Sequence, residues 1–407
     1  MQNSYRQTTL LTLDQIIKMQ PLTKLQAILT FVDYSIMLET FKIDYSKRGP
    51  KGFSYVSLLN ALIAMQIDKI PTVKALVTRL KTDPVLRVTC GFESIGKTPS
   101  QATFSRFIEK LSNTNILEKT FNRMVSRAKS LGLIDGNHVS IDATKLDAFE
   151  HAVPKSKIPE NNPNFPNWGA KQDTNGNMIK WFGWKMHAIV DTSSSIPLAY
   201  IITPANVADM AMAMPLMDKL KKDYDNLFKP SYYIMDTGYD TPAIYQHTLN
   251  KFGGQAIIPI NWRNTKVPPE GVNWKGQLVC SMNYPYVNGG NDNGTIRLLC
   301  AHACGKANCI MGSNWCSSAK SGYVGKVRIK DNPRFISYPL RGTEAWDTLY
   351  NERTSVERFF GDGKENYALN NIRVAGLKKV RVFIDLACIS ILATRIASVK
   401  QTSHSVA

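Results

Sequence analysis

Residues 350–364 read YNERTSVERFFGDGK, and the spacing of four of them decides how the rest of the chain is interpreted. Tyr350, Arg353, Glu357 and Lys364 follow one another at intervals of three, four and seven residues. At about 100° per residue, these positions fall within an arc of roughly 60° on a regular helix. A tyrosine, two cations and a carboxylate do not make an apolar packing face. The stripe is therefore either a solvated helix face or a functional one.

Two aspartates N-terminal to this stripe lie at the ends of predicted strands. Asp142 follows the β-prone run in VSIDATKLD (residues 139–147), and Asp236 follows the run in YYIMDTGYD (residues 232–240). An aspartate in such a place usually forms a turn or caps a helix. Gly238, however, lets the chain turn sharply beside Asp236, which favours a site there. We therefore treat both aspartates as candidate catalytic residues.

The elements around these aspartates alternate between strands and helices. Apolar patterning predicts three strands, a helix, a strand, a helix and a strand in that order, which is typical of an α/β domain. Further helices are predicted near the C-terminal end. The predicted strands cover residues 138–141, 185–190, 196–203, 232–235 and 255–260, and the predicted helices cover residues 206–220, 348–366 and 378–399, with another beginning at Pro242. We assign residues 136–260 and 346–399 to one α/β domain.

Residues 1–135 are basic and carry apolar residues at helical spacing. The clearest predicted helix start is TPSQ, residues 98–101, in which Thr98 is the expected cap. The helix behind it leaves Arg106 and Lys110 on or near its exposed side. It is either a recognition helix that reads DNA or an ordinary amphipathic helix. We predict a helical DNA-binding domain over residues 1–135, with Arg106 and Lys110 as candidate DNA contacts.

Residues 261–345 interrupt the α/β pattern and are predicted to be an insertion. They are rich in Gly, Asn and Pro, and Asn288-Gly289-Gly290 predicts a hairpin turn. Five of the seven cysteines lie between Cys280 and Cys316. Thiolates bind Zn²⁺ well, so this segment is a candidate structural zinc site, although its spacings are not the close pairs of a zinc ribbon. Reduced, unliganded thiols are the alternative. The predicted ligands are Cys300, Cys304, Cys309 and Cys316.

The charge of the chain indicates a polyanionic partner. Lys and Arg number 50 against 32 Asp and Glu, a formal net charge of +18, and nucleic acid is the simplest such partner. Hydrophobic residues make up 43% and charged residues 20%, which argues against disorder. The best apolar stretch, residues 382–397, is interrupted by Asp385 and Arg395, so we expect no membrane span. The N-terminal residues show no secretory signal and the cysteines fit a reduced compartment, so we expect a cytoplasmic protein.

Together these motifs resemble those of a known family. The pattern Y-x-x-R-x-x-x-E-x-x-x-x-x-x-K, complete here, is the signature of a large branch of the DDE transposases encoded by bacterial insertion sequences. DTGYD (residues 236–240) resembles that family's second-aspartate motif, and SIDATKLD (residues 140–147) resembles its first. The other similar segments are residues 184–210 and TPSQATFSRF at residues 98–107. The resemblance covers roughly residues 50–400 and is weakest in the insertion.

The resemblance implies an RNase H-like catalytic domain with an acidic triad. The triad would consist of Asp142, Asp236 and Glu357. It also implies that a pair of Mg²⁺ (or Mn²⁺) ions binds these carboxylates and relieves their mutual repulsion. Tyr350, Arg353 and Lys364 would hold DNA phosphates near the cut. A structural salt bridge is the competing role for Arg353.

The implied function is that of a DNA transposase, which cleaves phosphodiester bonds at the ends of its element and joins the freed 3′-hydroxyl ends to target DNA. The expected partner is double-stranded DNA, in the terminal repeats and the target, and bridging two ends implies a homodimer in the synaptic complex. Two alternatives stay open. One is a metal-dependent nuclease or resolvase of the same fold that does not join strands. The other is a domesticated DNA-binding protein without catalysis, against which the intact acidic set argues.

Overall fold

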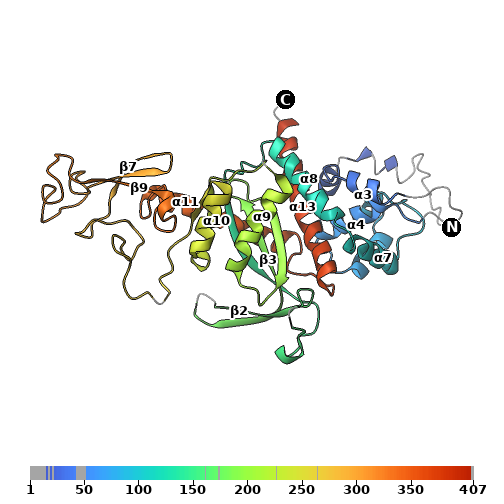
Figure 1. Ribbon diagram of the computed structural model, residues 1–407. Helices are drawn as coiled ribbons and strands as arrows, with labels where there is room; N and C mark the ends of the chain where they lie inside the picture. The colour runs from blue at the N-terminus through green and yellow to red at the C-terminus, as the bar shows by residue number, and fades with distance from the viewer. Residues whose placement is uncertain are drawn as a thin grey trace, which may run out of the picture.

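The protein is a mixed α/β structure built around one six-stranded sheet (Figure 1). The computed structural model describes residues 15–16, 19–20, 23–42, 52–160, 162–172, 175–225, 227–263 and 265–404, so the start of the predicted N-terminal domain lies outside the described residues. The strands are β1 (His138–Asp147), β2 (Asn167–Gln172), β3 (Met178–Asp191), β4 (Pro197–Pro204), β5 (Tyr232–Met235) and β6 (Gln255–Ile257). They lie in the order β2-β3-β1-β5-β6, with β4 also paired to β3.

The sheet is antiparallel on one side of β1 and parallel on the other. β3 runs antiparallel to β1, and β4 and β2 both run antiparallel to β3, whereas β5 is parallel to β1 and β6 is parallel to β5. In consequence β1, β4 and β5 all point in the same direction, and their carboxyl ends lie toward one edge of the sheet. This shared edge is where the candidate site forms.

Two strands differ from the sequence prediction. Asp142 does not end its strand, because β1 continues to Asp147 and pairs with β3 as far as Gly183. The Pro- and Asn-rich stretch expected to be a loop contains β2, which pairs with the first half of β3. Both differences have one cause. β3 is 14 residues long and supplies partners for chain that would otherwise be left without hydrogen bonds.

Helices cover both faces of the sheet. α9 (Ala213–Tyr224) packs on β3 and β4 and α10 (Pro242–Phe252) packs on β6, while α12 (Thr354–Asn366) packs on β1 and β3. The α12 side is fixed by a buried hydrogen bond between the hydroxyls of Ser140 and Ser355, 2.7 Å apart. α11 (Glu344–Asn351) precedes α12 and packs its Trp346 and Leu349 against the parallel strands. The 3₁₀ turns are η1 (Lys155–Lys157), η2 (Asp209–Met212), η3 (Thr237–Tyr239) and η4 (Ile329–Asp331).

The N-terminal region is helical, as predicted. Its helices are α2 (Lys24–Leu29), α3 (Ser35–Thr40), α4 (Tyr55–Ile67), α5 (Val73–Thr82), α6 (Pro84–Thr89), α7 (Gln101–Ser112) and α8 (Ile116–Ser130). The cap of α7 differs from the prediction: Ser100, and not Thr98, accepts the hydrogen bond from the backbone N–H of Thr103. Ser100 stands directly before the first helical residue, which is where a capping side chain reaches a free N–H.

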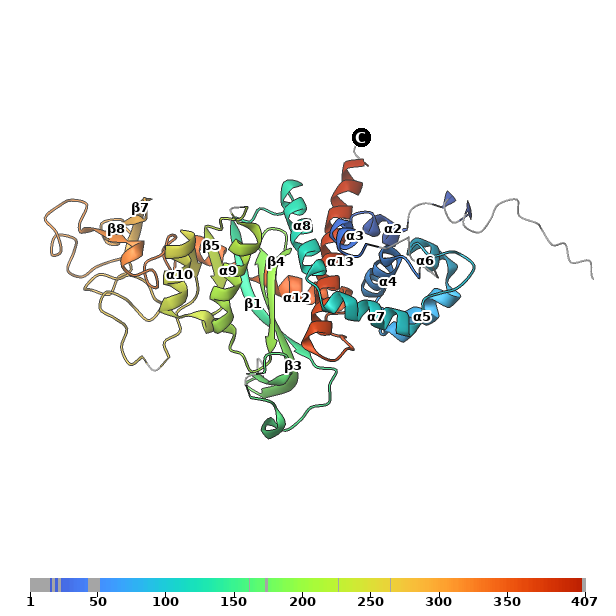
Figure 2. The ribbon, with the colours of Figure 1, turned by 45° about the vertical axis from the view of Figure 1, so that its right-hand side comes forward.

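The long C-terminal helix α13 (Leu377–His404) joins these helices to the sheet. It packs against α2, α4, α7 and α8 on one side and against α12 and β4 on the other, and both views show it running between the two regions (Figures 1 and 2). A single hydrophobic core runs from Leu25 to Ala397 through both regions. The predicted boundary near residue 135 falls between α8 and β1, but it does not separate two cores.

The length and composition of α13 differ from the expectation that no apolar segment is long enough to span a membrane. Over Leu377–Val399 this helix is long and apolar enough, by length and composition, to cross a bilayer, despite Asp385 and Arg395. However, 78% of its most apolar window is buried inside the protein. Apolar residues surround most of the helix because the N-terminal helices, α12 and β4 cover most of it.

Residues 261–345 form a lobe at the end of the molecule opposite the N-terminal helices (Figure 1). Its strands β7 (Val287–Asp292), β8 (Thr295–Leu299) and β9 (Val324–Arg328) form an antiparallel sheet. The predicted hairpin turn at Asn288-Gly289-Gly290 is wrong, because these residues lie within β7 and the turn is formed by Asn293 and Gly294. Both turn residues have positive φ, 47° and 79°, the conformation that a tight hairpin turn requires.

Candidate active site

The register of two parallel strands brings the two predicted aspartates together. Ile141 of β1 lies opposite Met235 of β5, and Asp142 and Asp236 are the next residues along each chain. The side chain of Asp142 is 22% exposed. Burial raises the pKa of Asp142 to about 6, and the negative charge of Asp236 contributes to this rise. The register thus places Asp142 and Asp236 next to each other on neighbouring strands.

The turn after β5 holds the Asp236 carboxylate in place. Its Oδ1 accepts a hydrogen bond of 2.8 Å from the backbone N–H of Gly238, so Asp236 caps η3. A Cβ added at Gly238 would lie 2.9 Å from that same Oδ1. A side chain at this position would therefore displace the Asp236 carboxylate, which lies directly over the backbone.

Glu357 reaches the pair of aspartates through Arg353. The Arg353 guanidinium lies 2.8 Å from Glu357 Oε1 through Nη2 and 3.8 Å from Asp142 Oδ2 through Nη1. Glu357 is in the first turn of α12 and its side chain is half exposed. The structure thus brings the three predicted acidic residues to one edge of the sheet, with a cation between two of them. Arg353 makes the salt bridge that the sequence left as its competing role.

Tyr350 and Arg353 do not lie on the same regular helix as Glu357, contrary to the prediction. α11 ends at Asn351 and α12 begins at Thr354. Between them the backbone N–H of Arg353 donates to Tyr350 O and that of Val356 donates to Arg353 O, so the chain passes through a tighter 3₁₀ turn. Tyr350 still hydrogen-bonds Arg353, and burial raises the pKa of its hydroxyl. Its ring stacks on Trp346, with ring centroids 5.3 Å apart.

Lys364 lies beside β1 at Thr144, which is two positions after Asp142 on the same face of the strand. Its Nζ donates to Thr144 Oγ1 at 2.5 Å. Burial and the neighbouring Lys145 lower the pKa of Lys364. It therefore flanks the acidic residues without contacting them, and it adds positive charge to the same surface.

The two candidate residues on α7 lie on the other side of α13 from the sheet (Figure 2). Arg106 is exposed. Lys110 donates from Nζ to the Tyr55 hydroxyl at 2.9 Å and lies over the rings of Phe41 and Tyr55, 4.1 and 4.3 Å from their centroids. Neither residue contributes to the acidic edge.

Sequence reasoning placed Asp209 near the motifs as a cap or turn residue and did not count it among the candidate catalytic residues of this edge. Its carboxylate lies 2.8 Å from Lys185 Nζ, and its negative charge contributes to the raised pKa values of both Asp142 and Tyr239. Asp209 follows β4, which runs parallel to β1 and ends at the same edge. The shared strand direction is the signal that would have identified it.

The predicted zinc ligands are not arranged as the sequence suggested. Cys304 is exposed and lies outside the cavity lined by Cys300, Cys309 and Cys316, where Cys280 is found instead. Within the part of the chain that the structure describes, no three His, Cys, Asp or Glu side chains are close enough, as they stand, to hold a metal ion. This applies to the cysteines and to the acidic edge alike.

Comparison with known proteins gives matches to transposases. A family model described as "Transposase domain (DUF772)" matches residues 12–110. A cryo-EM structure of a piggyBac transposase synaptic complex with hairpin DNA is 12% identical over 93% of this chain and 73% of that chain, with a TM-score of 0.39. A Mos1 transposase paired-end complex is 13% identical over 58% of this chain and 78% of that one, with a TM-score of 0.19. No curated protein matches the sequence.

The acidic edge lies within the segment that a second family model recognises. That model is described as "Transposase DDE domain" and matches residues 133–393, from just before β1 to near the end of α13. It spans well over half of the chain and all the strands and helices that carry the acidic residues. The protein therefore belongs to the DDE transposase family.

Proposed function

We propose that this transposase cleaves DNA at the ends of its element and joins the freed 3′-hydroxyls to target DNA, using Asp142, Asp236 and Glu357 as its acidic triad. The observation that carries the proposal is the parallel register of β1 and β5, which places the first two residues side by side. The Arg353 guanidinium then ties Glu357 to Asp142. The strand order β4-β3-β1-β5-β6, with helices on both faces, supports an RNase H-like assignment for this part of the chain.

The donor set fits hard divalent cations. Transposases of this family use divalent metal ions, and carboxylate oxygens are the ligands that Mg²⁺ and Mn²⁺ prefer. Burial is the main cause of the raised pKa of Asp142, and the negative charge of Asp236 adds to it; a bound cation would neutralise that charge. Bound there, the ions would supply the positive charge that activates an attacking hydroxyl and stabilises the leaving oxygen. We propose that the three acidic residues hold them.

The cationic residues around the triad are proposed to hold the DNA backbone. A guanidinium forms bidentate hydrogen bonds with phosphate as well as with carboxylate. Arg353 is therefore suited to exchange its contact with Glu357 for a DNA phosphate. Tyr350 orients that guanidinium, and Lys364 places a second positive charge further along β1.

Double-stranded DNA is the proposed partner of the whole chain, and the net charge of +18 supports this. Arg106 is the exposed candidate contact on α7. Lys110 lies over two aromatic rings and would have to contact a phosphate from that position. Because two element ends must be bridged, we propose a homodimer in the synaptic complex. The reaction partner is chromosomal DNA, so we propose a cytoplasmic location in a bacterial cell.

An excision assay in bacterial cells tests the proposal. The gene is supplied with its native flanking DNA, and excision and new insertion are compared for the wild type, Asp142→Asn and Glu357→Gln. Asp147→Asn is the matched control, because Asp147 ends the same strand but its side chain is 62% exposed and its salt bridge is with Lys145. We expect the wild type and the control to rearrange DNA and the two triad variants to lose this activity.

Two other outcomes would overturn the assignment. Cleavage without joining in the wild type would identify a nuclease or resolvase of the same fold. DNA binding that is equal in all four proteins, with no rearranged DNA from any of them, would identify a non-catalytic DNA-binding protein.

A further inference from the structure

The long loop between β8 and β9 lacks an obvious source of stability. Residues 300–322 contain only turns, with no helix or strand. The core of the insertion lobe is small, with Ile296, Leu298, Ile329, Ile336 and Leu340 as its buried members, and only the first two come from β8. A loop of this length without secondary structure needs another interaction to hold it.

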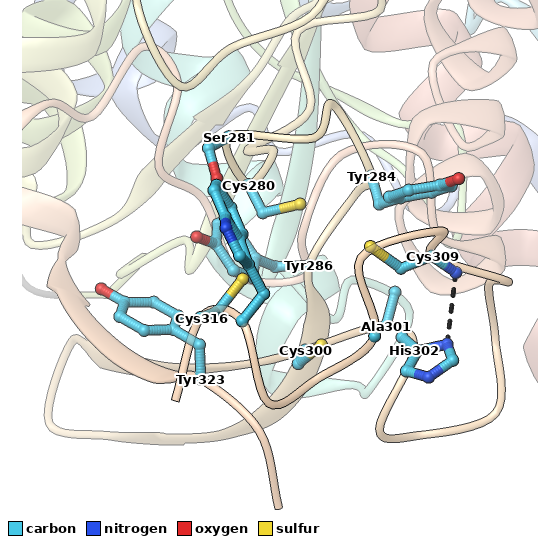
Figure 3. A pocket seen from close by; sticks show the side chains of 12 residues that line it. Cys280, Ser281, Tyr284, Tyr286, Cys300, Ala301, His302, Cys309, Cys316 and Tyr323 are labelled. Atoms are coloured by element: carbon cyan, nitrogen blue, oxygen red, sulfur yellow. Dashed lines mark hydrogen bonds between the residues drawn. The ribbon is translucent and has the colours of Figure 1, made fainter. Parts of the chain in front are cut away.

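Four cysteines surround one cavity in this lobe. The cavity has a volume of about 410 Å³, and Cys280, Cys300, Cys309 and Cys316 line it together with aromatic side chains. Figure 3 shows the four sulfur atoms arranged around the same space. All four thiols are free, without disulfide bonds. Burial and the nearby Cys280, Cys300 and Cys309 thiols raise the pKa of the Cys316 thiol.

The four cysteines come from three different parts of the lobe. Cys280 lies in a tight turn, where its N–H donates to Tyr284 O and its carbonyl accepts from Asn283 N–H. Cys300 extends the β8–β9 ladder through a 3.1 Å hydrogen bond from its N–H to Tyr323 O. Cys309 and Cys316 belong to the irregular loop. A bond that joined all four would therefore fasten the loop to the hairpin framework.

We propose that Cys280, Cys300, Cys309 and Cys316 form a structural Zn²⁺ site that closes the loop of residues 300–322 onto the β7–β9 sheet. Zn²⁺ favours four thiolate ligands in a tetrahedron, and its charge offsets the repulsion between the thiolates that form on binding. The thiols lose their protons on binding. Because the four ligands come together only in the folded lobe, the free energy of metal binding stabilises the folded lobe. Because no three ligands are close enough as they stand, the ion draws the sulfur atoms inward.

His302 and Cys304 lie nearby but are not part of the proposed ligand set. His302 Nδ1 already contacts backbone groups, at 3.2 Å from both Cys309 N and Ala307 O, and the ring is held away from the sulfur atoms (Figure 3). Cys304 is exposed and does not line the cavity. Cys304 therefore serves as a matched control, since it is a cysteine of the same loop outside the site.

The test measures zinc content in the full-length protein, purified with reductant and without chelator. We expect about one equivalent of Zn²⁺ per chain, retained through gel filtration. Replacement by Co²⁺ should give the visible absorption bands of tetrahedral thiolate coordination. Cys280→Ser and Cys309→Ser should lose most of the metal, and Cys304→Ser should keep all of it. Removing the metal from the wild type with a chelator should lower the melting temperature.

Three results would overturn the proposal. A wild-type protein without metal, whose four cavity thiols react freely with a thiol reagent, would show that the cysteines are unliganded. Equal zinc loss in Cys304→Ser and Cys280→Ser would show a different ligand set. A metal-free cavity that takes up an apolar dye would identify a small-molecule pocket. Zinc content is measured without DNA, so these results do not depend on strand cleavage. If the variants fail to fold, the cobalt spectrum of the wild-type protein is the deciding measurement.

Discussion

The Arg353 guanidinium lies between two of the three carboxylates on which the proposed chemistry depends. Replacing it with alanine should remove both the link between Glu357 and Asp142 and the proposed phosphate contact. We expect Arg353→Ala to reduce cleavage of an element-end duplex by roughly 10²–10³-fold, the usual effect of losing one positioned charge-stabilising group. The salt dependence of DNA binding should also become shallower, by about one unit of slope.

Arg358→Ala is the control for this prediction. Arg358 lies on α12, which begins directly after Arg353, but it contacts the hydroxyls of Ser195 and Thr354 and is not part of the acidic edge. The two variants are compared in cleavage and binding assays with purified protein. Equal cleavage by Arg353→Ala and Arg358→Ala would limit Arg353 to a structural salt bridge.

Single residues also show how far the sequence can lead. The spacing of Tyr350, Arg353 and Glu357 and the two aspartate motifs identified residues that do meet at one edge of the sheet. Asp209 was interpreted as a cap or turn residue near the motifs, because its place at the edge depends on strand direction and a lone aspartate after a strand usually forms a turn. Cys280 was passed over in favour of Cys304 for a similar reason, because sequence distance does not reveal which thiols face one cavity.

The element that carries Glu357 provides a matched pair of glycines. Gly361 has open space around the position of an added Cβ, whereas a Cβ at Gly363 would lie 2.4 Å from Leu369 Cδ1, a buried side chain. Both substitutions by alanine gain the same helix propensity. We expect Gly363→Ala to be less stable than Gly361→Ala by about 1–3 kcal/mol, the cost of overpacking.

Urea unfolding of the two glycine variants measures this difference. Gly361→Ala should unfold at the same urea concentration as the wild type or a higher one, because it removes about 0.5–1 kcal/mol of helix penalty. Equal midpoints for the two variants would show that Leu369 moves aside without cost.

The junction between α11 and α12 explains why one continuous helix was predicted. No proline or glycine lies between Tyr350 and Glu357, so the periodicity gives no sign of a break. α11 packs Trp346 and Leu349 on the parallel strands, while α12 packs on β1 and β3. The chain tightens between them because the two helices follow different parts of a twisted sheet. Only the tertiary structure contains this requirement.

Asp385 is buried where α13 packs against the sheet, at the contact that joins the two regions of the molecule. The Tyr200 hydroxyl donates to Asp385 Oδ1 at 2.6 Å. Burial raises the pKa of Asp385 from 3.8 to about 7. The folded protein therefore binds a proton at pH values at which the unfolded chain has lost it, so this group's contribution to stability decreases as the pH rises from about 4 to about 7.

Asp385→Asn should remove that pH dependence, because asparagine stays neutral and still accepts the bond from Tyr200. We expect the melting temperature of the variant to rise relative to the wild type between pH 4 and pH 7. Asp347→Asn, on the exposed side of α11, is the control and should follow the wild type. A constant difference between Asp385→Asn and the wild type across this range would contradict the prediction.

At this scale the sequence predicted the helical and α/β regions but not their common core. Helical spacing identified the N-terminal region as helical and predicted the helix over residues 378–399, yet apolar residues on every side of α13 do not reveal which elements cover them. The strand order likewise requires pairings between distant segments. Local sequence patterns predict which residues are buried, but they do not predict which elements cover those residues.

The shared core has a consequence for the order in which the protein is made. α13 is translated after all the other helices and strands, yet it contacts both the N-terminal helices and β4. On the ribosome, the earlier segments expose the apolar surfaces that α13 later covers. We therefore expect fragments that stop before Leu377 to be degraded or to aggregate. A premature stop would thus eliminate the protein and would not release a stable DNA-binding inhibitor of the full-length enzyme.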